Sequence, residues 1–239
     1  MLSKSFTLNI NSSIKPFKKI IKVDSDKSLS IRSFLIGAIS QDISKAYNIL
    51  ESEDVYSTID CLRKLGVKIK KVKPKAYLIH GKGLGSLIAR KNLHLNFGNS
   101  GTLARLLIGI LSTTPNIEIK IEGDHSLNKR NMKKLIVIMS EFGAEFLPKN
   151  KFNFPLKLIS TEMPIGINYK AGVSAQLKSA VILAGLNSFG STKIIEDEKS
   201  RDHTENMLIK NFKTIKIKRG KKKIIEIFGK KYLNSININ

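Results

Sequence analysis

The sequence predicts an α/β fold made of three βαβαββ repeats, with helices packed inside and sheets outside. The first observation is that three apolar, helix-like segments each begin with a small polar cluster and carry a cation four or five residues further on. The second is that these cations, Arg32, Arg105 and Lys178, are spaced by 73 residues in both intervals. A fixed period indicates an internal repeat, and each unit is too small to bury its apolar face alone. We therefore expect the three helices, and the cations on them, to be related by an approximate threefold axis.

The remaining elements of each repeat follow the first helix in the same order. A strand comes next, in segments that are rich in β-branched residues and alternate in polarity: 44–49, 117–122 and 191–196. A second helix starts at a polar cluster and ends near Gly66, Gly143 and Phe212, of which the two glycines are typical of helix C-termini. Closing strands are expected in the first and third units over 67–72, 76–80, 214–218 and 224–228.

These patterns set the domain boundaries. The threefold-repeat globe is expected over 20–229, with units of about 20–89, 90–162 and 163–229. Residues 1–19 lie before the repeats, and the alternation from Leu2 to Ile14 predicts one strand there. Residues 230–239 are polar and follow the last repeat.

Composition narrows the class of protein. Of the 239 residues, 41% are hydrophobic, which is enough for a sizeable core and excludes a disordered or collagen-like chain. The single cysteine, Cys61, excludes a disulfide framework and a multi-cysteine zinc site. No apolar run approaches the ~20 residues of a membrane span, and the first residues lack the apolar core of a signal peptide. We expect a cytoplasmic protein with no membrane partner.

The charge balance is strongly basic, with a formal net charge of +23. Such a field attracts polyanions or small anionic substrates, although a general abundance of lysine explains it equally well. The basic run 216–223 fits either a nucleic-acid patch or a hairpin that turns at Arg219 and Gly220. We favour the hairpin and expect no nucleic-acid partner, because the chain has no Trp and its five Tyr are scattered.

Threefold packing should bring the equivalent helix N-termini to one place. A helix N-terminus presents free backbone N–H groups and about half a positive charge. With Lys27, Arg32, Arg130 and Arg201 nearby, three such ends predict a site for a multiply anionic small molecule. The stretch 98–102 lets a ligand approach the backbone closely through its glycines, and the chain contains no Walker loop.

Each of these residues also has an ordinary structural interpretation. Ser28, Thr102 and Ser174 are residue types typical of helix N-caps. Arg105 and Lys178, on helix faces, fit a structural role better than a catalytic one. The combination of these residues, rather than any one of them, favours a ligand site.

Five ordered motifs carry a resemblance to a known family. They are Ser-Asp-Lys-Ser-Leu-Ser-Ile-Arg at 25–32, Gly-Asn-Ser-Gly-Thr at 98–102, Gly-Asp-His-Ser-Leu at 123–127 with Arg130, Val-Ser-Ala-Gln at 173–176, and Ser-Arg-Asp-His-Thr-Glu at 200–205. Over essentially the whole chain, they resemble the enolpyruvyl transferases, and among these the 5-enolpyruvylshikimate-3-phosphate synthases. The peptidoglycan branch of the family is less similar, because its reactive cysteine has no counterpart here.

The resemblance implies a reaction and its substrates. The enolpyruvyl (carboxyvinyl) group of phosphoenolpyruvate is transferred to the 5-hydroxyl of shikimate 3-phosphate, and phosphate is released. This step belongs to the shikimate pathway, which leads to chorismate and the aromatic amino acids. No metal or organic cofactor is implied. The alternative is a non-catalytic anion-binding half-domain of a split or degraded enzyme.

The resemblance also implies roles for individual residues. Lys27 would touch both substrates and is the expected catalytic residue. Residues implied at shikimate 3-phosphate are Lys27, Ser28, Arg32, Ser174, Gln176, Ser200 and Arg201. Residues implied at phosphoenolpyruvate are Lys27, Asn99, Gly101, Arg130 and Gln176.

The chain departs from the family pattern in sequence and in length. Asp24 and Ser25 replace the usual Pro and Gly, Ile31 replaces a His, and Asn131 replaces a Pro, but none of these removes an implied ligand.

The family has two similar globes. Its first strand, here within 1–19, belongs to the second globe, and residues 230–239 would begin the crossover to it. We therefore expect a fragment that is inactive alone, with a second chain as one source of the missing globe.

Overall fold

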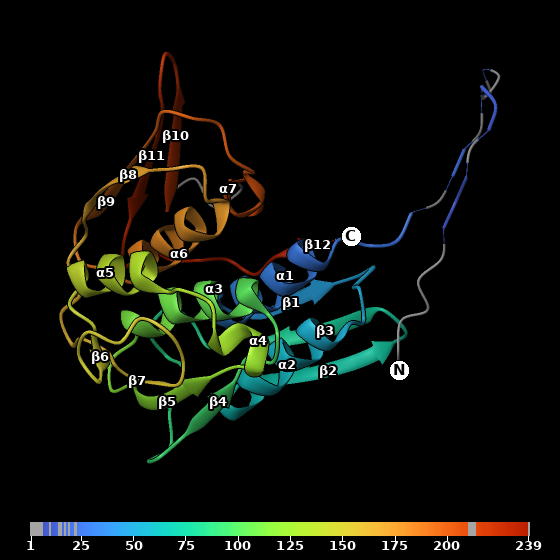
Figure 1. Cartoon of the computed structure of the whole chain (residues 1–239). Coiled ribbons are helices and arrows are strands. Elements are labelled where there is room, and N and C mark those ends of the chain that lie inside the picture. Colours follow the sequence, from blue (N-terminus) through green and yellow to red (C-terminus); the bar gives the residue numbers. More distant parts are fainter. Residues whose placement is uncertain are drawn as a thin grey trace.

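Three four-stranded sheets with one common topology form the outside of the molecule (Figure 1). The structure is a computed structural model that describes residues 7–9, 11–13, 16, 18, 20–21, 23–209 and 214–238. In sheet order, the second unit contains β4 (His94–Asn96), β5 (Glu118–Glu122), β7 (Leu156–Ile159) and β6 (Glu145–Leu147). The third contains β8 (Asn168–Ala171), β9 (Ser191–Glu196), β11 (Lys223–Phe228) and β10 (Ile215–Arg219). In both, the first pair is parallel and the others are antiparallel. The predicted repeat is confirmed.

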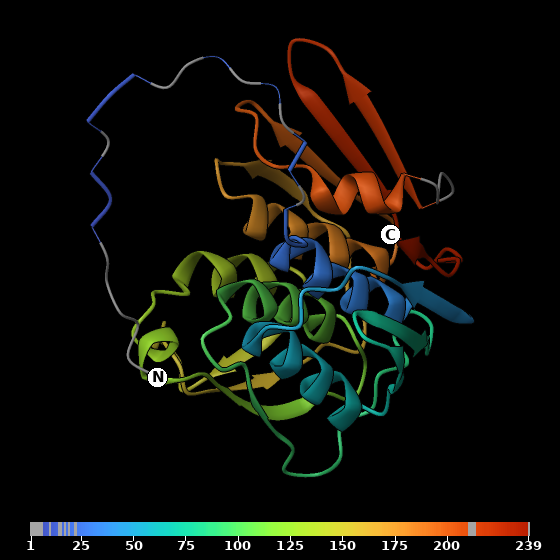
Figure 2. The same cartoon turned by 90° about the vertical axis from the view of Figure 1, so that its right-hand side faces the viewer.

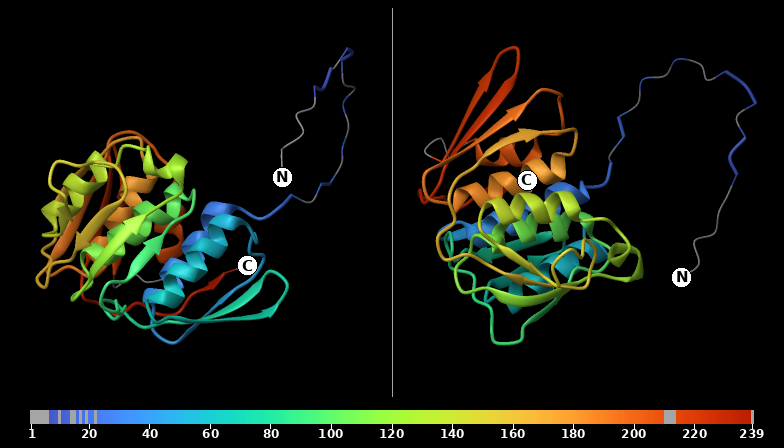
Figure 3. Two further views of the ribbon diagram at one scale, coloured as in Figure 1. Left: turned by 60° about the horizontal axis from the view of Figure 1, so that its bottom comes forward. Right: turned by 60° about the vertical axis from the view of Figure 1, so that its left-hand side comes forward.

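The first unit takes its parallel outer strand from the end of the chain. Its sheet contains, in order, β12 (Asn237–Ile238), β1 (Ile43–Ala46), β3 (Ala76–His80) and β2 (Lys68–Lys73). β12 runs parallel to β1, just as β8 runs parallel to β9 (Figure 3). The expectation that 20–89 forms a complete unit is therefore wrong, because its outer strand comes from beyond residue 229.

Backbone hydrogen bonds attach the segment before β12 to the same unit. The Gln41 N–H donates to the Leu233 carbonyl at 2.8 Å, and the Ile236 N–H donates to Ser44 Oγ at 3.0 Å. Leu233 and Ile236 are buried. The polar tail thus completes the threefold globe over 233–238, while a crossing from there to a further globe stays a prediction.

Three helices form the shared core. These are α1 (Lys27–Ile39), α3 (Gly101–Ser112) and α6 (Ala175–Leu186), and each is buried on almost every side. Figure 2 shows them in blue, green and orange between the sheets. Outer helices cover them, namely α2 (Glu53–Lys64), α4 (His125–Asn128), α5 (Lys133–Glu141) and α7 (His203–Leu208). Helices that are apolar all round require burial on all sides, so the prediction of helices inside and sheets outside is confirmed.

The start of each core helix repeats one hydrogen bond. The N-caps are Asp26, Ser100 and Ser174, and each side-chain oxygen accepts from the N–H of the Leu three residues later. These caps are spaced by 74 residues, one more than the cations. Arg32, Arg105 and Lys178 therefore lie six, five and four residues after their caps. Since each residue turns a helix by about 100°, the three cations lie on different faces of their helices, and the expected threefold relation of the cations is wrong.

Most smaller expectations agree with the structure. Gly66 and Gly143 follow helix ends with φ of +87° and +103°, as the C-cap prediction requires. The basic run forms the β10–β11 hairpin, with Arg219 opposite Lys223. Ser28 and Thr102 are not N-caps but lie within the first turn of their helices.

Most of the predicted N-terminal strand, and Phe212, lie outside the described residues, and residues 7–9 and 11–13 are in no strand. Across the described ranges, no helix has the length and apolar character needed to cross a bilayer. Cys61 is buried, and burial raises the pKa of its thiol to about 12, as expected of a core residue.

The role of the C-terminal segment can be measured. Leu233→Ala should lower the free energy of unfolding by about 2–5 kcal/mol, because the side chain is 1% exposed and its removal leaves a cavity. The neighbouring Tyr232→Ala is the matched control, since Tyr232 is 64% exposed and its loss should cost about 0.5 kcal/mol or less. Urea unfolding measures both, and equal losses would contradict the packing of this segment.

Candidate anion-binding site

The residues singled out from the sequence lie at the N-terminal ends of the core helices. Lys27, Ser28 and Arg32 are in the first turns of α1, Asn99 and Gly101 are at the start of α3, and Ser174 and Gln176 are at the start of α6. The remaining three precede α7 or follow α4, namely Ser200, Arg201 and Arg130. They therefore come from all three repeats.

Side-chain hydrogen bonds join these helix ends. Gln176 Nε2 donates to Thr102 Oγ1 at 3.0 Å and connects α6 with α3. Arg32 Nε donates to Thr204 Oγ1 at 2.8 Å, and Nη2 donates to Ser179 Oγ at 3.2 Å, which connects α1 with α7 and α6. The expected convergence of the three repeats is thus visible in direct contacts.

Arg32 is a buried cation held by neutral groups. It is 3% exposed, and Nη1 donates to both the carbonyl and the hydroxyl of Ser28. Its hydrogen-bond acceptors among the described residues are therefore hydroxyls and one carbonyl. Burial, together with the nearby charge of Arg201, lowers the pKa of Arg32 to about 10, against the opposing charges of Asp26 and Glu205. Four of its five N–H groups are in use, which leaves one donor at Nη2 for an anion.

Two serine hydroxyls keep a proton to donate. Ser174 Oγ accepts from the Leu177 N–H at 3.4 Å, and Ser28 Oγ accepts from Arg32. Neither hydroxyl donates to another group within the described residues. An accepting hydroxyl retains its own O–H, so both can donate to an incoming phosphate or carboxylate.

Two guanidinium groups meet at the start of α3. Arg105 Nη1 donates to the Gly101 carbonyl at 3.0 Å, and Arg130 Nη2 donates to Asn99 Oδ1 at 2.5 Å. A Cβ atom at Gly101 would lie 2.8 Å from Arg105 Nη1 and 2.9 Å from Arg130 Nη1, so glycine makes this approach possible. Burial and the charge of Arg130 lower the pKa of Arg105. Two like charges beside a helix N-terminus favour a bound anion.

Sequence reasoning gave Arg105 a structural role, but it lies in this cationic group. The available signal was its place one helical turn after Gly101, which brings its side chain back over the helix start. Arg105 and Ser174 also line a cavity of about 910 Å³ between α5 and the start of α6, together with Lys133, Lys134 and Tyr169.

Lys27 lies at the rim of the site. Its Nζ forms an ion pair with Asp54 Oδ2 at 3.0 Å, and its side chain is 51% exposed. Arg201 is also exposed. To contact a substrate, the Lys27 ammonium must exchange or share Asp54, which is an inexpensive step for a solvated pair.

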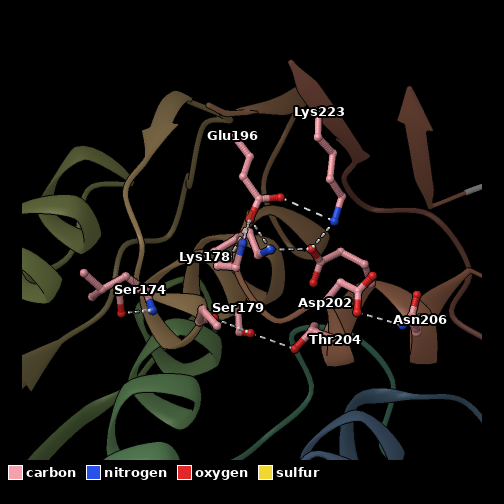
Figure 4. Close-up of polar contacts among 12 residues, drawn as sticks. Ser174, Lys178, Ser179, Glu196, Asp202, Thr204, Asn206 and Lys223 are labelled. Carbon is pink, nitrogen blue, oxygen red and sulfur yellow. Dashed lines mark hydrogen bonds and ion pairs between the residues drawn. The ribbon is translucent and has the colours of Figure 1, made fainter. Parts of the chain in front are cut away.

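A buried group of four charges supports the third repeat (Figure 4). Lys178 is fully buried, with Nζ 2.7 Å from Glu196 Oε1 and 2.8 Å from Glu205 Oε1. Lys223 Nζ lies 3.0 Å from Glu205 Oε1 and 3.4 Å from Glu196 Oε2. The structural role expected of Lys178 therefore agrees with its contacts, since two buried carboxylates depend on it.

Glu196 connects this group with Ser200. Its Oε1 accepts from the Ser200 N–H at 2.9 Å and from the Ser200 hydroxyl at 2.7 Å. Burial opposes ionisation of Glu196, but hydrogen bonds from Lys178 and Ser200 prevail and lower its pKa to about 2. Sequence reasoning missed Glu196. The one signal was Lys178 in an apolar helix, because a buried cation needs a carboxylate partner.

The fold and site define a threefold-repeat globe whose helix N-termini, hydroxyls and guanidinium groups come together at one candidate anion-binding surface. A profile of the EPSP synthase family (3-phosphoshikimate 1-carboxyvinyltransferase) matches residues 12–239, and the chain belongs to this family. EPSP denotes 5-enolpyruvylshikimate 3-phosphate, so the family resemblance seen in the motifs is confirmed.

Individual relatives agree. The chain is 41% identical over 191 residues to the 3-phosphoshikimate 1-carboxyvinyltransferase of Paramagnetospirillum magneticum, a match that covers 80% of this chain and 42% of the relative. It is 42% identical over 204 residues to that of Lactococcus lactis, covering 84% and 46%. An EPSP synthase structure from Acinetobacter baumannii superposes with a TM-score of 0.81 at 36% identity, covering 91% of this chain and 48% of the other. The chain thus spans less than half the length of these relatives.

The buried carboxylate predicts a pH dependence of stability. Because the pKa of Glu196 falls from 4.5 to about 2 on folding, its contribution is complete above pH 4.5 and is lost as the pH falls from there toward 2. Between pH 6 and pH 3, wild type should lose about 2 kcal/mol more unfolding free energy than Glu196→Gln. Urea unfolding at both pH values measures this difference. Parallel losses in the two proteins would show that Glu196 is not held ionised.

Proposed function

We propose that this chain binds shikimate 3-phosphate and phosphoenolpyruvate at the converging helix N-termini and takes part in enolpyruvyl transfer between them in the cytoplasm. The observation that carries the proposal is the set of free donors around this surface, namely the hydroxyls of Ser28 and Ser174 and the guanidinium groups of Arg32, Arg105 and Arg130. Family membership supports it, because relatives named 3-phosphoshikimate 1-carboxyvinyltransferase share the fold.

Shikimate 3-phosphate is assigned to the starts of α1 and α6 and to the loop before α7. Ser28, Ser174 and Ser200 offer hydroxyls there, Arg201 adds a solvated positive charge, and Arg32 keeps one free N–H. A phosphate and a carboxylate on one small ring match this mixture of hydroxyls and cations, since charge-assisted hydrogen bonds are the strongest available.

Phosphoenolpyruvate is assigned to the start of α3. Arg130, positioned by Asn99, and Arg105 provide adjacent cations beside the Gly101 backbone. Gln176 lies between the two assigned subsites through its bond to Thr102.

The reaction explains why cations dominate the site. The 5-hydroxyl oxygen gives up its proton and bonds to C2 of phosphoenolpyruvate while C3 gains a proton, and the resulting tetrahedral intermediate carries two phosphates and two carboxylates. Loss of phosphate and of a C3 proton then restores the enol ether. Preorganised positive charge stabilises such an intermediate without reorganisation, and we assign Lys27, at the start of α1, to contact with both substrates. Further acid–base groups come from outside this globe, on a longer chain or a second one.

The binding test uses the wild-type chain and calorimetry. Shikimate 3-phosphate should bind more tightly than shikimate, and Ser174→Ala should weaken the phosphorylated ligand by about 5–30-fold, the scale of one charge-assisted hydrogen bond. Ser86→Ala is the control, because Ser86 is exposed and bonds only the nearby Leu84 carbonyl among the described residues. No preference for the phosphorylated ligand at millimolar concentration would overturn the proposed function.

Gly101 provides a second test at the other subsite. Gly101→Ala should weaken phosphoenolpyruvate binding about tenfold, because the added methyl must displace the tips of Arg105 and Arg130. Shikimate 3-phosphate affinity should change little. Gly220→Ala is the control, since a Cβ atom there has only the Lys222 carbonyl within 4 Å, at 3.9 Å. Equal loss of both ligands in Gly101→Ala would contradict the assignment of this subsite.

Turnover separates the enzyme from a non-catalytic anion-binding domain. With the other half of a full-length relative supplied as a separate chain, phosphate release should appear, and Lys27→Met should abolish it. Binding that is intact but never leads to phosphate release, in any such mixture, would favour the non-catalytic alternative.

A further inference from the structure

Ser200 differs from the other two serines of the site in where its proton goes. Ser28 and Ser174 accept hydrogen bonds within the protein and keep their protons free. The Ser200 hydroxyl instead donates to Glu196 Oε1 at 2.7 Å. A phosphate oxygen is an acceptor, so Ser200 can serve it only by giving up this bond.

The acceptor that holds the proton is unusually strong. Glu196 has a side chain that is 2% exposed, and Oε1 accepts from Lys178, from the Ser200 N–H and from the Ser200 hydroxyl. Lys178 and Lys223 balance the two buried carboxylates, so that the group of four carries no net charge. Hydrogen bonds to an ionised acceptor are about twice as strong as neutral ones.

The contacts also allow the hydroxyl to leave. When it rotates away, Oε1 keeps the bonds from Lys178 and from the Ser200 N–H, and no buried oxygen loses its last partner. The backbone of Ser200 stays fixed by its N–H. Exchange of the proton between Glu196 and a ligand therefore needs one side-chain rotation and no movement of the loop.

We propose that Glu196 is a positioning residue that competes with the substrate phosphate for the Ser200 hydroxyl proton and thereby limits the affinity of the phosphate subsite. The inference rests on the proposed function, in which Ser200 faces the phosphate of shikimate 3-phosphate. It assigns opposite effects to two residues of the third repeat, since Ser174 adds to phosphate affinity while Glu196 reduces it.

The competition has a catalytic use. The 3-phosphate takes no part in the reaction and is present in substrate and product alike. Binding it more tightly would stabilise both equally, and would slow product release without lowering the barrier of the chemical step. Because Glu196 competes for the proton, the Ser200 hydroxyl can still orient the 3-phosphate but binds it only weakly.

The first experiment leaves the buried charges untouched. Ser200→Ala should weaken shikimate 3-phosphate binding less than about threefold. The ligand gains little from the Ser200 hydroxyl, because that hydroxyl must give up its bond to Glu196 before it can donate to the phosphate. Ser174→Ala, with its free proton, should weaken the same ligand about 5–30-fold. Titration calorimetry of both variants, with circular dichroism to confirm folding, gives the comparison. An equal loss in Ser200→Ala and Ser174→Ala would overturn the proposal.

The second experiment changes Glu196 and uses Glu205 as its matched control. Both are buried carboxylates whose Oε1 accepts from Lys178 and whose Oε2 has no hydrogen bond within the described residues, but only Glu196 contacts Ser200. Glu196→Gln should raise the ratio of shikimate 3-phosphate to shikimate affinity by about 5–10-fold over Glu205→Gln, since a neutral acceptor competes less well. A merely structural role of Glu196 predicts a lower affinity for both ligands.

The outcomes separate this inference from the proposed function. A wild-type chain that does not prefer shikimate 3-phosphate over shikimate overturns the proposed function itself. A wild-type preference combined with no gain in Glu196→Gln relative to Glu205→Gln overturns the competition alone. If Glu196→Gln fails to fold, the Ser200→Ala and Ser174→Ala comparison decides the question.

Discussion

Burial of α1, α3 and α6 on almost every side is the constraint on which the rest of the structure depends. Helices that are apolar all round leave water only at their ends. The sides of these helices pack against the three sheets and against one another. The first N–H groups of each helix, however, have no hydrogen-bond partner within the helix. The caps Asp26, Ser100 and Ser174 each satisfy one such group. Further N–H groups remain in the first turn of each helix, and free N–H groups at a helix N-terminus favour a bound anion.

The same constraint explains how the charges divide into two kinds. At the helix N-termini, Arg32, Arg105 and Arg130 have neutral hydrogen-bond acceptors within the described residues, which is the arrangement that the proposed anion site requires. Further into the third repeat, Lys178 cannot reach solvent and is neutralised by two glutamates. Removing one member of such a group costs more than the pair itself contributes, because the remaining charge is left buried. The first set of cations is the one proposed to bind the ligand, and the second supports the fold around it.

The repeat and the helix order could be predicted because apolar periodicity and glycine C-caps are local signals. The observed starts of β1 and β5 each differ by one residue from the predicted starts, and the predicted bounds of β9 agree with the structure. The register between repeats could not be predicted from the cations, since their spacing of 73 differs by one residue from the 74 of the caps. Spacings of 73 and 74 residues are almost the same in sequence, but an offset of one residue moves a side chain to another face of its helix.

The candidate site residues were named as a set through family motifs and stay a prediction, while the side chains that they contact could not be foreseen. Nothing in the sequence links Gln176 with Thr102, or Ser200 with Glu196, because these contacts depend on how the three repeats pack and on the path of the loop before α7. β12 was missed for a related reason. It has only two residues, and a polar tail gives no alternation long enough to indicate a strand.

The position of β12 has a consequence for how the protein is made. Strand β1 pairs Lys45 with Asn237, so the first sheet to be synthesised is the last to be completed. The second unit can assemble its sheet from contiguous chain as it leaves the ribosome, and so can the third, whereas the parallel edge of β1 stays open until residues near 237 arrive. Long-range parallel pairing of this kind is slow, and an open strand edge is prone to association with other chains. During translation, the nascent first repeat is therefore the part of this globe that has most need of a chaperone.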